Sequence, residues 1–173
     1  MLRGTSAVLL VLVLAGCSTT DSVPTVDLAI AALASADGKP VGTAAVSRHA
    51  SATIVSVTVT GAPGAVHGLH LHTVGKCESP FTSAGPHLNP GGHQHGKDSP
   101  LGAHLGDLPN VTIDKAGFGS VSIGLAGDAA SIEAALFDAD GTSIVLHAAA
   151  DDYRSDPTGN SGARIACGVL KQT

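Results

Sequence analysis

Residues 55–59 read Val-Ser-Val-Thr-Val, with an apolar β-branched residue at every second position and a hydroxyl residue between. Successive side chains of a strand point to opposite faces, so this alternation predicts a half-buried strand whose valines face a core. Residues 121–125, Val-Ser-Ile-Gly-Leu, repeat the same period. The domain is therefore expected to be built from strands that each bury one face.

Further runs rich in β-forming residues extend this pattern along the chain, and turn signals such as Asp37-Gly38 and Asp140-Gly141 separate several of them. They cover residues 26–33, 41–49, 66–74, 111–114, 143–148 and 164–170. Eight short strands predict an all-β sandwich or barrel. Residues 129–136 fit either a helical turn or a loop. Two long segments, 75–109 and 149–163, interrupt the strands, and loops of that length are usually functional.

The composition supports one folded domain and excludes some functions. Of 173 residues, 43% are hydrophobic and 13% charged, which excludes a disordered polyampholyte. The formal net charge is −5, basic runs are absent, and the chain has no tryptophan, one tyrosine and three phenylalanines. Nucleic-acid binding normally requires a basic stripe or stacking aromatics, so the composition argues against that class.

The N-terminus has the pattern of a signal peptide. Arg3 is the only charge among the first 20 residues, and an apolar run follows at 7–14. This run is too short to span a bilayer. Residues 14–17, Leu-Ala-Gly-Cys, resemble the lipobox of bacterial lipoproteins. The resemblance implies a signal peptide at 1–16, a lipidated Cys17 with a tether over 17–25, and a membrane-anchored domain at 26–173 in the bacterial cell envelope. The alternative is ordinary secretion with Cys17 unmodified.

Cysteine usage agrees with export. If Cys17 carries lipid, Cys77 and Cys167 remain. In an oxidising compartment two remaining cysteines most simply form one disulfide, and the alternative is two free thiols.

Nine histidines form the most unusual feature of the composition. His70 and His72 lie two apart on a predicted strand, so their side chains share one face. His147 ends another predicted strand. The long loop carries further metal-type ligands: His87, His95, His104 and Asp107. Imidazole suits copper and zinc, and three histidines with one aspartate match tetrahedral zinc. The pattern predicts a metal centre.

Several motifs occur in a fixed order along the chain. They are Gly-Leu-His-Leu-His at 68–72, Ser-Ala-Gly-Pro-His-Leu-Asn-Pro at 83–90, His-Gly at 95–96, His-Leu-Gly-Asp-Leu at 104–108, His147 with Asp151-Asp152, and Gly-Ala-Arg-Ile-Ala-Cys-Gly-Val at 162–169. Together they resemble the copper,zinc superoxide dismutase family, in its bacterial lipoprotein-type form, over residues 26–170. The resemblance implies an eight-stranded Greek-key β-barrel, an immunoglobulin-like sandwich, with two long functional loops.

The resemblance also implies a role for each residue of the site. Copper would be held by His70, His72, His87 and His147, and zinc by His87, His95, His104 and Asp107. His87 would bridge the two metals, and Arg164 would attract and orient superoxide beside the copper. Asp151 would hydrogen-bond His70 and His95, His67 would be structural beside the copper strand, and Cys77 would pair with Cys167. The implied reaction converts superoxide to dioxygen and hydrogen peroxide by copper redox cycling.

Two other functions stay open at this point: an envelope copper- and zinc-binding lipoprotein without turnover, and a scaffold domain that binds no metal. The second long loop is shorter than in animal and plant relatives, so their steering residues cannot be carried over. Lys76, Lys97 and Arg154 are alternative steering candidates. Residues 93 and 49, both histidines, are expected to be exposed and outside the site, and the chain is expected to be a monomer or a homodimer.

Overall fold

The computed structural model describes residues 23–173, so the predicted signal peptide and Cys17 lie outside the described residues. Within residues 23–173, no helix is long and apolar enough to cross a membrane. The elements are β1 (Thr25–Ser35), β2 (Pro40–His49), β3 (Ala52–Thr60), β4 (Val66–His67), β5 (Leu69–His72), η1 (Thr82–Ala84), β6 (Val111–Thr112), β7 (Phe118–Gly124), α1 (Ala129–Leu136), β8 (Ser143–His147), β9 (Arg164–Val169) and β10 (Lys171–Gln172).

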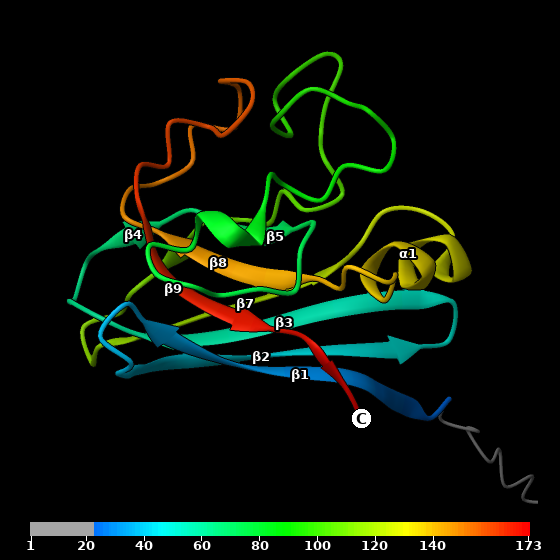
Figure 1. Ribbon diagram of the computed structural model, residues 1–173, viewed down its shortest axis with the longest axis horizontal. Helices are drawn as coiled ribbons and strands as arrows, with labels where there is room; N and C mark the ends of the chain where they lie inside the picture. Colours follow the sequence, from blue (N-terminus) through cyan, green and yellow to red (C-terminus); the bar gives the residue numbers. More distant parts are fainter. Residues whose placement is uncertain (1–22) are drawn as a thin grey trace, which may run out of the picture.

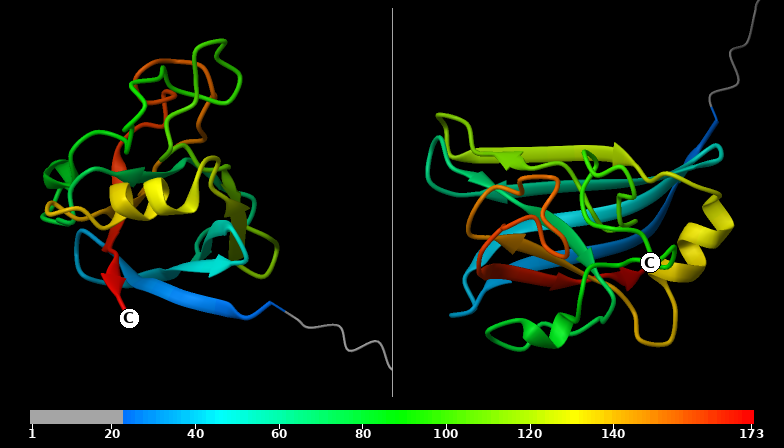
Figure 2. Two further views of the ribbon diagram at one scale, coloured as in Figure 1. Left: turned by 90° about the vertical axis from the view of Figure 1, so that its right-hand side faces the viewer. Right: turned by 90° about the horizontal axis from the view of Figure 1, so that it is seen from above.

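Eight antiparallel strands form one curled sheet in the order β5-β8-β9-β1-β2-β3-β7, with β10 also paired to β1 (Figures 1 and 2). Strands β1 to β3 are consecutive hairpins, and β9 returns along β1 from the far end of the chain. This is a Greek-key connection. The edge strands of this sheet are β5 and β7. The strands that precede them in the chain, β4 and β6, pair with each other as a short two-stranded ribbon. The predicted all-β fold class is confirmed.

The valines at 55, 57 and 59 are buried, as their alternation predicts, and the inner faces of β1 and β2 pack against them. Leu71 on β5 and Leu146 on β8 bury their side chains in the same core. The core therefore fixes the register of the two strands that carry three of the predicted metal-binding histidines, His70, His72 and His147.

Two predicted strands are each divided in the structure. The run at 66–74 is interrupted at Gly68, whose N–H donates to the Ala149 carbonyl (2.8 Å) and whose carbonyl accepts from His147 N–H (2.9 Å). A Cβ at residue 68 would lie 2.8 Å from Ser161 Oγ, so glycine allows this close approach. The run at 164–170 divides into β9 and β10.

Residues 129–136, which fit a helical turn or a loop, form the helix α1. Asp128 caps it, because its carboxylate accepts from Ser131 N–H (3.0 Å). Arg48 on β2 donates to both carboxylate oxygens of Glu133 at 2.9 and 3.1 Å, which ties the helix to the sheet.

Both long loops rise from one side of the barrel, above β5 and β8 (Figure 1). The predicted disulfide is confirmed: Cys77 in the first loop is bonded to Cys167 on β9, 90 residues later in the chain. Next to it, Phe81 and Ala84 pack with Val145 in a small buried cluster. This bond joins the base of the first loop to the barrel.

Replacing both bonded cysteines, in Cys77→Ser/Cys167→Ser, should lower the free energy of unfolding by roughly 4–5 kcal/mol, because the open chain regains the entropy of a large closed loop. Urea unfolding of protein beginning at Ser18 measures this difference. Wild-type protein unfolded with a reductant should match the double variant. Equal unfolding free energies for oxidised wild type and the double variant would contradict the expectation.

Candidate metal centre

Four buried histidines meet above the barrel. His70 and His72 lie on β5, His147 ends the neighbouring strand β8, and His87 reaches them from the first long loop. One ring nitrogen from each lies within 4.8 Å of the others. The four side chains that the sequence suggested for copper are therefore brought together, three of them by paired strands.

Hydrogen bonds fix which ring nitrogen of each strand histidine faces the centre of the cluster. His70 Nε2–H donates to Asp151 Oδ2 (2.8 Å), and His72 Nδ1–H donates to the Gly85 carbonyl (2.8 Å). His147 Nδ1–H donates to the Gly162 carbonyl at 3.3 Å. A neutral imidazole that donates through one nitrogen keeps a lone pair on the other. Each ring thus presents its other nitrogen as a lone-pair donor.

These lone pairs are the test of whether the cluster suits a metal. His70 Nδ1, His72 Nε2, His87 Nε2 and His147 Nε2 are all buried and have no hydrogen-bond partner. Buried polar atoms without partners are costly and rare. A transition-metal ion satisfies all four at once, and nitrogen donors are those copper prefers. The residues present fit the ion.

A second cluster is centred on the carboxylate of Asp107. Its Oδ1 lies 3.0 Å from His87 Nδ1, 3.0 Å from His95 Nδ1 and 3.2 Å from His104 Nδ1. Its Oδ2 accepts from the backbone N–H groups of Gly96 and His104. Three imidazole nitrogens and one carboxylate oxygen are a donor set typical of zinc. The donor atoms of His70, His87, His95 and Asp107 all lie within 4.8 Å of one another, and His104 stands outside this group but contacts Asp107.

The electrostatics of the two clusters differ. Burial lowers the pKa of His72 to about 2, of His147 to about 3 and of His87 to about 4, so these rings stay neutral as metal ligands must. Burial also disfavours protonation of His95, but hydrogen bonds to Asp107 and Asp151 outweigh it and raise the pKa to about 9. The second cluster therefore attracts a cation strongly.

Asp151 connects the two clusters. Besides accepting from His70, its carboxylate accepts from His95 Nε2–H at 2.9 Å, and both rings and the carboxylate are buried. Burial raises the pKa of Asp151, but the hydrogen bonds from the two histidines dominate and hold it well below the usual range. One ionised carboxylate therefore sets the orientation of a ring in each cluster.

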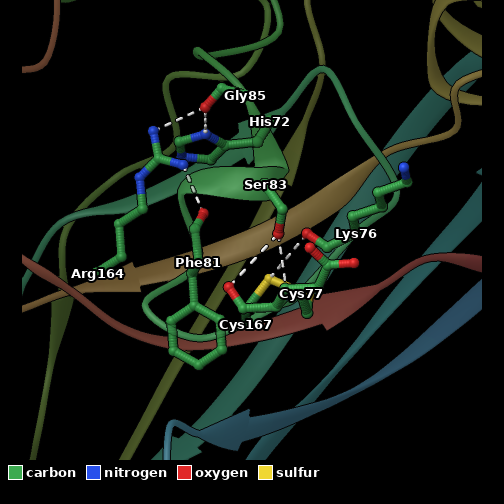
Figure 3. The surroundings of a disulfide bond; sticks show 9 residues. His72, Lys76, Cys77, Phe81, Ser83, Gly85, Arg164 and Cys167 are labelled. Carbon is green, nitrogen blue, oxygen red and sulfur yellow. Dashed lines mark hydrogen bonds between the residues drawn. A yellow bond between two sulfur atoms is a disulfide. The ribbon is translucent and has the colours of Figure 1, made fainter.

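Arg164 lies at the start of β9, opposite His147 on β8. Its guanidinium donates to the carbonyls of Phe81 and Gly85, both at 2.7 Å. Figure 3 shows that Arg164 and His72 share the Gly85 carbonyl, beside the disulfide. The loop held by the disulfide therefore positions both the arginine and one ring of the first cluster.

The remaining predicted residues occupy outer positions. His67 Nδ1–H donates to the His147 carbonyl (2.8 Å), which supports the strand end that carries His147. His49 and His93 are exposed and belong to neither cluster. Sequence reasoning missed the carbonyls of Phe81, Gly85 and Gly162 that orient the rings and the arginine, because a backbone acceptor leaves no signal in residue type.

The fold is a Greek-key barrel, and its paired strands and long loops bring together two adjoining histidine clusters. These features are those of a metalloprotein with two neighbouring metal sites. Residues 41–170 match the family model for copper/zinc superoxide dismutase. The chain is 37% identical to superoxide dismutase [Cu-Zn] 2 of Aquifex aeolicus over 147 residues, which is 82% of this chain and 85% of that protein.

Solved structures agree with this match. The crystal structure of a SOD-like protein from Bacillus subtilis superposes with a TM-score of 0.73 at 33% identity, covering 82% of this chain and 97% of that one. The Cu/Zn superoxide dismutase from Brucella abortus gives a TM-score of 0.64 at 27% identity, covering 86% and 100%. The chain belongs to the copper/zinc superoxide dismutase family. It is an oxidoreductase with copper and zinc as its cofactors.

Asp151→Asn should lower the affinity for both metals, by about 10–100-fold each, because an amide carries no negative charge and has one acceptor oxygen where the carboxylate uses two for His70, His95 and Tyr153. Competition with a chelator measures each affinity separately. Asp98→Asn is the matched control, since Asp98 is an exposed loop carboxylate paired with Lys97. A change confined to one metal would show that Asp151 does not act on both clusters.

Proposed function

We propose that the protein converts superoxide to dioxygen and hydrogen peroxide, with copper held by His70, His72, His87 and His147. Zinc is held by His87, His95, His104 and Asp107. The observation that carries this assignment is the set of four buried ring nitrogens without partners, directed at one point. When bound, copper supplies a one-electron exchange in both directions, whereas zinc does not change its redox state.

His87 has the position that a bridging residue needs. Its Nδ1 lies 3.0 Å from Asp107 Oδ1, and its unpartnered Nε2 faces the other three histidines of the first cluster. The two nitrogens of one ring thus serve two clusters. His87 would hold a proton at Nε2 when that atom is free of metal, and would deliver it to the reduced oxygen species. The second proton that hydrogen peroxide requires would come from solvent water.

Arg164 supplies a fixed positive charge beside the first cluster. Two carbonyls hold its guanidinium, and burial lowers its pKa from a value so high that the group stays charged. A preorganised cation of this kind attracts and orients an anionic substrate. The seven proposed ligand side chains lie in the two clusters with Arg164 beside them, which supports turnover over metal retention alone, because a protein that only retains metal has no need of the arginine.

We propose that the chain is exported and anchored to a membrane of the bacterial cell envelope through a lipid on Cys17. The support is the apolar run at 7–14, the Leu-Ala-Gly-Cys motif that follows it, and the Cys77–Cys167 disulfide, which is typical of oxidising compartments.

Metal-loaded protein beginning at Ser18 should consume superoxide, and His87→Ala should abolish this activity because it removes a donor from each cluster. Arg164→Ala should lower the rate roughly 10-fold or more, since local steering of an anion is worth about 10- to 1000-fold. The wild-type rate should also fall as salt rises, and less so in Arg164→Ala. Pulse radiolysis measures both rates.

Lys39→Ala is the control, because Lys39 is an exposed turn residue paired with Asp37. Metal-loaded wild-type protein without turnover would overturn the dismutase assignment in favour of metal binding alone. Turnover that Arg164→Ala leaves unchanged would keep the enzyme and remove the steering role.

Cys17→Ala should release the protein from membranes, because it removes the acceptor of the lipid. Fractionation of bacterial cells that express full-length chain measures the distribution between membrane and soluble fractions. Wild-type chain should be recovered with membranes and should incorporate labelled palmitate. Equal distribution of wild type and variant would contradict lipid anchoring and leave ordinary secretion.

A further inference from the structure

Asn110 links the two long loops through Asp151, whose carboxylate connects the metal clusters. It directly follows the first loop and precedes β6, and it makes three hydrogen bonds to the second loop. Its Nδ2–H donates to the Asp151 carbonyl (2.9 Å), and its Oδ1 accepts from Asp151 N–H (2.8 Å). Its own N–H donates to the hydroxyl of Tyr153 at 2.7 Å. Asn110 therefore holds Asp151 by both polar groups of its backbone.

The carboxylate of Asp151 has little freedom once this backbone is held. Tyr153 N–H donates to its Oδ1 (2.6 Å), and Tyr153 is itself tied to Asn110. Gly159 also lies against this oxygen, because a Cβ at residue 159 would collide with Asp151 Oδ1 and lie 2.5 Å from His95 Nε2. The carboxylate is enclosed between a clamped backbone and the backbone of a glycine.

We propose that Asn110 is a positioning residue for both metal sites. By fixing the backbone of Asp151, it keeps one carboxylate within hydrogen-bond distance of His70 and His95 together. A displacement of this carboxylate disturbs a ring in each cluster, so Asn110 acts on copper and zinc through the same contact. This inference rests on the proposed metal sites and adds a residue whose side-chain hydrogen bonds go to the backbone of Asp151 and not to a ligand ring.

The experiment compares Asn110→Ala with Asn160→Ala, a matched control. Asn160 is an asparagine of the second loop whose amide donates to Asp152 and Ser155 without touching Asp151. Chelator competition gives the zinc and copper affinities, and the Cu(II) electron paramagnetic resonance spectrum reports the geometry of the copper ligands. Asn110→Ala should lower both affinities about 10-fold and shift the spectrum, as loss of outer hydrogen bonds to ligands does. Asn160→Ala should do neither.

A double variant shows whether the effect passes through Asp151. If it does, Asn110→Ala added to Asp151→Asn should cause no further loss of affinity, whereas independent effects multiply. Unchanged affinities, loss of one metal only, or multiplied losses would each overturn the inference. If Asn110→Ala does not fold, Asn110→Ser, which retains one polar group, is compared in the same way. Wild-type protein that binds neither metal would instead overturn the proposed function.

Discussion

Buried imidazole nitrogens need partners, and this requirement organises the site. Each strand histidine turns one nitrogen to an acceptor that the fold provides and leaves the other facing the centre of the first cluster. Four such lone pairs on buried rings are costly until a cation satisfies them. These lone pairs stay aligned only if the surrounding backbone is rigid, because a mobile imidazole ring would rotate towards another hydrogen-bond partner.

The barrel and the loops divide this task. Paired strands β5 and β8 place His70, His72 and His147, and the core below fixes their register. The loops place the other ligands and are held at three points: the disulfide, the guanidinium of Arg164 on two carbonyls, and Asn110. Loops are usually more variable and mobile than strands. Here each of the three contacts restrains the loop backbone, as ladder hydrogen bonds would restrain a strand.

Sequence patterns predicted the parts whose residue types are diagnostic. The alternating valines at 55–59 predicted a core strand, and the spacing of His70 and His72 predicted a shared ligand face. The ordered motifs predicted Asp151 between His70 and His95. The carbonyls of Gly85 and Gly162 could not be predicted, because every residue carries one. Asn110 carried no signal either, since an asparagine beside a short strand is most simply read as a turn residue.

Charge balance explains why carboxylates stand beside the imidazoles. Neutral imidazoles coordinate a cation without compensating its charge, and an uncompensated charge in a buried site is unfavourable. Asp107 and Asp151 are both buried or nearly so, and hydrogen bonds hold both pKa values far below the usual range, so each contributes a full negative charge. The bound cations balance these two charges, whereas the net charge of −5 on the whole chain opposes the approach of an anionic substrate. A fixed cation beside the first cluster offsets this repulsion locally, and Arg164 has the geometry to provide it.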